Sequence, residues 1–110
     1  MIKVSGVSGK SIIADAIQKY NGAVIYSYYN ELLPFENCYN VYPDEHSVKE
    51  FCNGITDDIK EEVKRNEELP LNMVVIYTNV SDDLEIHTLY LYAKRLEENK
   101  LVGTVVVMTQ

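Results

Sequence analysis

Positive charge, cysteine and tryptophan are all scarce in this sequence. Its 110 residues include 10 lysines and arginines against 17 aspartates and glutamates, two cysteines and no tryptophan, and the formal net charge is −7. So few cations cannot cover the phosphates of a nucleic acid, and we expect no direct nucleic-acid binding. Cys38 and Cys52 are too few and too far apart for a zinc knuckle. We expect them to be reduced thiols in a cytoplasmic protein.

Long apolar runs are also missing. No stretch approaches the roughly 20 apolar residues that a membrane-spanning helix needs, and the first residues lack the pattern of a signal peptide. We therefore expect no membrane association. The composition is otherwise that of an ordinary globular chain, 46% hydrophobic and 25% charged. At this length it suits one core, so we predict a single domain over residues 1–110.

Apolar runs alternate with amphipathic stretches along the chain. Strands are predicted at residues 2–5, 23–29, 73–77 and 103–109, with a shorter one at 38–42. Helices are predicted at 12–20, from a Ser47-x-x-Glu50 capping box onward, and at about 83–99. Gly54 interrupts the second of these and leaves a kink or restart near Thr56-Asp57 open. Strands that are apolar nearly throughout and separated by helices predict an α/β fold. It should be a three-layer, mostly parallel, four- or five-stranded sheet with helices on both faces.

An anion-binding loop is predicted directly after the first strand. Residues 5–11 read Ser-Gly-Val-Ser-Gly-Lys-Ser, and an amphipathic helix follows them. Small residues let the backbone turn with its N–H groups pointing inward, and a lysine at the helix start adds positive charge. The last three residues match the end of the phosphate-loop signature, whose lysine reaches the phosphates and whose serine holds magnesium. The predicted phosphate-binding residues are Gly6, Ser8, Gly9, Lys10 and Ser11.

The beginning of this loop departs from the full signature. Counting back from Gly9, the first glycine should stand at position 4, and Val4 is there. Either the loop lacks about two residues or its first glycine has been replaced by valine.

The order of these parts resembles the core of the additional-strand class of P-loop ATPases, which includes the RecA and DnaB type and the FtsK and HerA type. The likeness is closest over residues 91–110, where a charged helical stretch leads to a strand ending in Thr109-Gln110. In those families the glutamine of such a pair senses the γ-phosphate. The resemblance therefore implies a sensor role for Gln110, with ATP or GTP and magnesium as the ligand. It also implies that the last strand lies between the first strand and the strand at 73–77, with the strand at 23–29 beyond.

Several catalytic positions of the resembling families hold other residues in this sequence. Those families place an aspartate at the end of the third strand, where residues 77–79 read Tyr-Thr-Asn. The RecA and DnaB group keeps a glutamate at the end of the second strand, where residues 27–29 read Ser-Tyr-Tyr and Glu31 lies two residues on. Asp82 and Asp83 could substitute, but their place before a helical stretch is more typical of a helix cap.

Two functions remain open on this sequence. One is a degenerate nucleotide- or phosphate-binding domain with little or no hydrolysis, used as a regulator or subunit of a larger assembly. The other is a protein-interaction module of P-loop ATPase descent, for example from a mobile element, that no longer binds nucleotide. Lys10 and Ser11 favour the first, whereas Val4 and the missing carboxylates favour the second. An active kinase or NTPase with unorthodox carboxylates is disfavoured.

Both functions call for a partner. The resembling ATPases carry a further strand for which this sequence has no counterpart, so the backbone of residues 2–5 is expected to be open to pairing. We expect a protein partner or a homo-oligomer.

Overall fold

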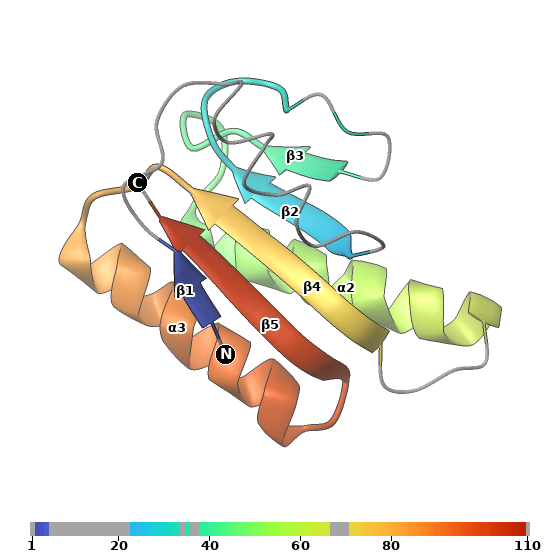
Figure 1. Cartoon of the computed structure of the whole chain (residues 1–110). Helices are drawn as coiled ribbons and strands as arrows, with labels where there is room; N and C mark the ends of the chain where they lie inside the picture. The colour runs from blue at the N-terminus through green and yellow to red at the C-terminus, as the bar shows by residue number, and fades with distance from the viewer. Residues whose placement is uncertain (1, 5–22, 34, 36–37, 67–70, 110) are drawn as a thin grey trace.

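Five parallel strands form one sheet in the computed structural model, which describes residues 2–4, 23–33, 35, 38–66 and 71–109 (Figure 1). The strands are β1 (Ile2–Val4), β2 (Val24–Tyr28), β3 (Cys38–Val41), β4 (Leu71–Thr78) and β5 (Val102–Thr109). Every hydrogen-bonded pair of neighbouring strands is parallel. The predicted α/β class and parallel sheet are confirmed. The prediction allowed four or five strands, and β3 is the fifth.

The strands lie in the order β1-β5-β4-β2-β3. The last strand of the chain, β5, therefore lies between β1 and β4, as expected from the resemblance. β4 and β5 form the longest pair, in register from Leu71 opposite Val102 to Thr78 opposite Thr109. The short β1 and β3 form the two edges of the sheet.

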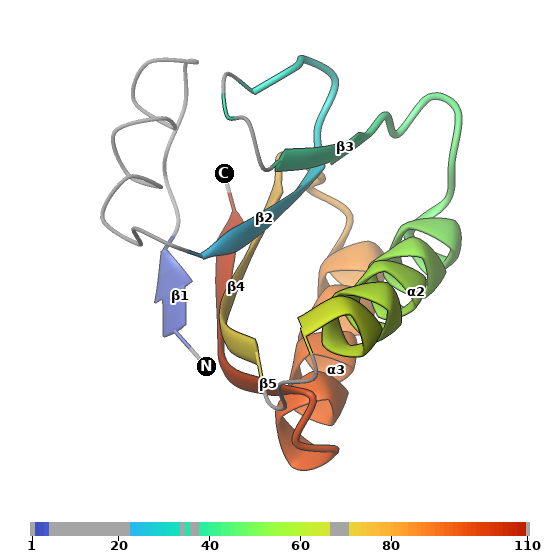
Figure 2. The same cartoon turned by 90° about the vertical axis from the view of Figure 1, so that its right-hand side faces the viewer.

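Helices α2 (Val48–Asn66) and α3 (Asp83–Glu98) lie on the same face of the sheet (Figure 2). They connect β3 to β4 and β4 to β5, two crossovers that run in the same direction along the sheet. Right-handed crossovers in one direction lie on one face, which explains the shared helix layer. The helix predicted at residues 12–20 lies outside the described residues, so the third layer stays a prediction. Within the described part of the chain, no helix has the length and apolar character needed to cross a bilayer.

Both faces of the central strands are buried. Residues 74–77 of β4 and 105–108 of β5 have no exposed surface at all. Alternate residues of these strands contribute to two separate apolar clusters, one of which contains all of the buried helix residues. The buried apolar residues of the helices are Val48, Phe51, Cys52, Ile55, Ile59, Leu89, Ala93 and Leu96.

Helix α2 begins at the predicted capping box and continues without a break. Glu50 N donates to Ser47 Oγ, and Ser47 N donates to Glu50 Oε1, both at 3.2 Å. The helix does not restart near Thr56-Asp57, because it is continuous over Val48–Asn66. Ile55 and Ile59 are fully buried in the turns that follow Gly54. Their burial outweighs the cost of about 1 kcal/mol that a glycine adds to a helix interior.

Replacing the serine of the capping box tests how α2 is started. Ser47→Ala should lower the free energy of unfolding by about 1 kcal/mol, because the N–H of Glu50 loses its side-chain acceptor. Chemical denaturation measures this loss. Ser81→Ala, at an exposed serine outside the helices, is the control and should change stability by less than about 0.5 kcal/mol. Equal losses in the two variants would contradict the capping role.

Candidate functional site

The carboxyl ends of the parallel strands meet at one edge of the sheet, called here the carboxyl edge. Its residues include Val4 of β1, Thr109 of β5, Thr78 of β4 and Tyr28 of β2. The strand described after β1 is β2, which lies on the side of β4 that faces away from β1. After β4 the chain instead returns toward β1 and forms β5. The connections that leave β1 and β4 thus run in opposite directions, and β5 lies between these two strands. Open α/β sheets bind ligands at the carboxyl edge where this reversal occurs.

The residues predicted to bind phosphate lie outside the described residues: Gly6, Ser8, Gly9, Lys10, Ser11 and Gln110. Their described neighbours are Val4, which ends β1, and Thr109, which ends β5. These two strands are hydrogen-bonded neighbours, with Val4 opposite Met108. The predicted loop and Gln110 therefore both follow strands that end side by side. Val4 belongs to β1, so the position of the signature's first glycine is part of a strand.

Thr78 occupies the end of β4, close to where the resembling ATPases carry a metal-binding aspartate. Its hydroxyl is fully buried, donates to the carbonyl of Tyr28 at 2.9 Å and accepts from Val80 N at 3.0 Å. The side chain thus ties the end of β4 to the end of β2 and shapes the turn toward α3. The hydroxyl of Thr78 is committed to the backbone.

Of the carboxylates considered as substitutes, Asp82 has a structural role. Asp82 is the N-cap of α3, where its Oδ1 accepts from Glu85 N at 3.0 Å. The prediction of a helix cap is confirmed. Glu31 is exposed and accepts from the hydroxyl of Tyr29 at 3.4 Å. Within the described ranges, no three histidine, cysteine, aspartate or glutamate side chains are grouped so that they could hold a metal ion.

Two buried hydroxyl groups lie near the carboxyl edge on the face opposite α2 and α3. Ser27 of β2 and Tyr77 of β4 are register partners with no exposed surface, and neither hydroxyl makes a hydrogen bond within the described structure. The ring of Tyr29 packs edge-on against Tyr77, with ring centres 5.3 Å apart. Burial, followed by the nearby Tyr29, raises the pKa of Tyr77 to about 12, so this hydroxyl keeps its proton at neutral pH.

Sequence reasoning missed this hydroxyl pair. The only signal was a serine inside the apolar run at residues 23–29. The strand register places Tyr77 of β4 beside this serine, Ser27. No local sequence pattern specifies that register. A buried hydroxyl without a partner costs about 1–3 kcal/mol. Each of these two hydroxyls therefore carries a cost in folding stability.

Comparisons with known proteins add no family to this description. No protein-family model, curated protein or solved structure matches the chain. The sheet, its carboxyl edge and the residues found there are therefore the basis for inferring a function.

Removing the hydroxyl of Thr78 tests its structural role. Thr78→Val keeps the shape of the side chain but leaves the Tyr28 carbonyl and Val80 N–H without this partner. The free energy of unfolding should fall by about 1–3 kcal/mol in denaturant titrations. Thr88→Val is the matched control, because the exposed Thr88 hydroxyl bonds only to Leu84 O within its own helix. A loss at Thr78 no larger than that at Thr88 would contradict this role.

Proposed function

We propose that this chain is a degenerate nucleotide- or phosphate-binding domain with little or no hydrolysis, which acts as a regulator or subunit of a larger assembly. The ligand is ATP or GTP, with magnesium, held by the loop at residues 6–11. The observation that carries the proposal is the position of β5 between β1 and β4. Because of it, the strand before the glycine-rich loop and the strand before Gln110 end next to each other.

The chemistry at the carboxyl edge supports binding more than turnover. Loop N–H groups and Lys10 can attract a polyphosphate without any carboxylate. Hydrolysis further needs a well-held metal and a positioned water. At the end of β4 the hydroxyl of Thr78 is bonded to the backbone, and Asp82 caps a helix. Neither residue is placed to do what a metal-binding carboxylate does.

The edge position of β1 supports a role in an assembly. Among the described strands β1 pairs with β5 alone, over three residues. An edge strand presents backbone N–H and C=O groups that can pair with another chain. A second copy or a partner protein that adds a strand beside β1 would extend the sheet.

The alternative function is a protein-interaction module of P-loop ATPase descent, for example from a mobile element, that binds no nucleotide. Two observations favour it: Val4 stands in β1 where the signature begins with glycine, and Thr78 replaces a carboxylate at the end of β4. Nucleotide binding is the measurement that separates the two functions.

Nucleotide binding should appear as thermal stabilisation. Millimolar ATP or GTP with magnesium should raise the melting temperature, since a ligand at about 100 times its dissociation constant adds roughly 2.7 kcal/mol to folding stability. Lys10→Ala should abolish the shift, whereas Lys94→Ala, at an exposed lysine of α3, should keep it. Little or no phosphate release should accompany binding.

A melting curve that nucleotide leaves unmoved would reject this function in favour of the interaction module. Steady turnover that disappears in Lys10→Ala would instead contradict the argument from the missing carboxylates.

Association of the chain is measured separately. Light scattering at increasing protein concentration should give a mass above the 12.6 kDa of one chain, because one side of β1 pairs with no described strand and an edge strand can pair with another chain. A mass that stays at 12.6 kDa at high concentration would contradict self-association through this edge.

A further inference from the structure

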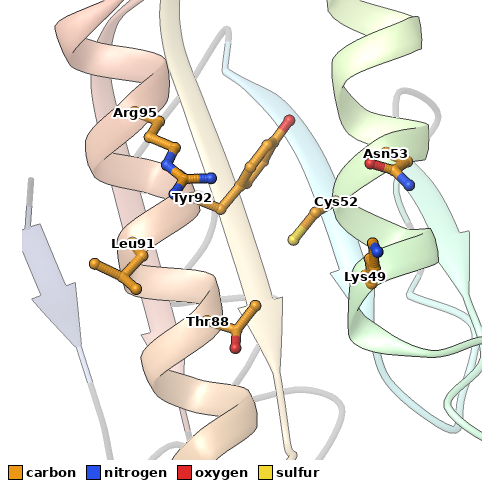
Figure 3. Close-up of a pocket in the computed structure, with 7 residues that line it drawn as sticks. All are labelled: Lys49, Cys52, Asn53, Thr88, Leu91, Tyr92 and Arg95. Atoms are coloured by element: carbon orange, nitrogen blue, oxygen red, sulfur yellow. The ribbon is translucent and has the colours of Figure 1, made fainter.

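A hollow of about 280 Å³ opens between α2 and α3, on the helix-covered side of the sheet (Figure 3). Cys52 of α2 and Tyr92 of α3 lie between the helices and form its inner part, and the hydroxyl of Tyr92 is hydrogen-bonded to Thr56 of α2. Burial raises the pKa of the Cys52 thiol to about 11, so this side chain is uncharged at neutral pH. The inner surface of the hollow is therefore mostly apolar and held by a contact between the two helices.

Two cations line this hollow from opposite helices. Lys49 extends from α2 and Arg95 from α3 (Figure 3), and both are exposed. Neither forms an ion pair with another residue of the described ranges, whereas Lys94, next to Arg95 in sequence, lies 4.0 Å from Glu98. No carboxylate lines the hollow. In a chain of net charge −7, two unpaired cations around one opening favour a negatively charged ligand.

Exposed leucines extend the apolar surface along α3. Leu91 lines the hollow and is 45% exposed, and Leu84, two helical turns earlier, is 76% exposed. Residues seven apart lie on the same side of a helix, so the two leucines form one stripe with Thr88 between them. Clustered exposed apolar side chains rimmed by polar ones are typical of protein contacts.

We propose that this hollow docks an acidic segment of a partner protein. An aliphatic side chain of that segment enters between Cys52 and Leu91, and its carboxylates pair with Lys49 and Arg95. The proposal extends the role as a subunit proposed above and depends on that role, but it requires no nucleotide.

The size and charge of the hollow favour such a segment over other anions. Pockets for small molecules enclose about 300–1,000 Å³, so 280 Å³ suits one or two side chains better than a cofactor. Two cations are too few to hold a nucleic acid backbone. A free anion would leave the Leu84–Leu91 stripe uncovered, whereas a peptide lying along α3 would cover it.

The probe is a random peptide library displayed on phage. Peptides are selected for binding to the full chain and against binding to the double variant Lys49→Glu/Arg95→Glu. Enriched peptides should carry aspartate or glutamate on both sides of a leucine, isoleucine or valine. A synthetic peptide of the enriched sequence should lose at least about tenfold in affinity by fluorescence anisotropy with Arg95→Glu, and likewise with Leu91→Ala. Added salt should weaken binding.

Lys94→Glu is the matched control, because it reverses the neighbouring charge on α3 without touching the hollow, and it should keep the affinity within about twofold. Circular dichroism checks that each variant is folded, and all the substituted residues are exposed. Nucleotide should raise the melting temperature of Arg95→Glu as much as that of the original chain. Failure of the docking proposal is therefore distinguishable from failure of the nucleotide proposal.

Three results would overturn the docking proposal. The first is no selective enrichment, or enriched peptides that bind Arg95→Glu as well as the original chain. The second is displacement of the peptide by succinate or inorganic phosphate at concentrations near the peptide's own dissociation constant, which would assign the hollow to a small anion. The third is self-association that Arg95→Glu abolishes, which would assign it to a second copy of this chain.

Discussion

The central pair of strands, β4 and β5, must hide both of their faces from water. Residues 74–77 and 105–108 have no exposed surface, and apart from the hydroxyl of Tyr77 their side chains are apolar. Parallel strands of this kind need a crossover connection, and the crossovers supply the helices that bury one face. The position of the two helices, the common carboxyl edge and the hollow between α2 and α3 all follow from that requirement.

Apolar runs and helix caps allowed most of the described elements to be predicted from the sequence. The strands at 73–77 and 103–109, the capping box at Ser47 and the cap at Asp82 depend on residues close together in the chain, and the structure has them. The restart left open near Thr56-Asp57 does not occur, because helix propensity is local while the burial of Ile55 and Ile59 against the sheet is not.

The features of the candidate site and of the docking hollow could be predicted only in part. The glycine-rich loop could be predicted because its residues are consecutive in the sequence. The hydroxyl pair of Ser27 and Tyr77 depends on strand register, and the cation pair of the hollow depends on how two helices pack. Lys49 and Arg95 each look like an ordinary surface residue of a charged helix in the sequence, since nothing there says that they share one opening without a carboxylate. Only the tertiary structure brings such residues together.

Contacts along β2 and α2 connect the hollow to the carboxyl edge. Cys52 lines the hollow, and the preceding residue, Phe51, stacks on the ring of Tyr28 with centres 5.1 Å apart. The carbonyl of Tyr28 in turn accepts the hydrogen bond from Thr78 at the end of β4. All of these residues are buried, and close-packed interiors resist small displacements. Coupling between two sites requires an element with two arrangements that each ligand favours differently. Because the described residues along this path are buried and close-packed, we expect a partner docked on α2 and α3 to be positioned in the same way whether or not phosphate is bound at the proposed loop.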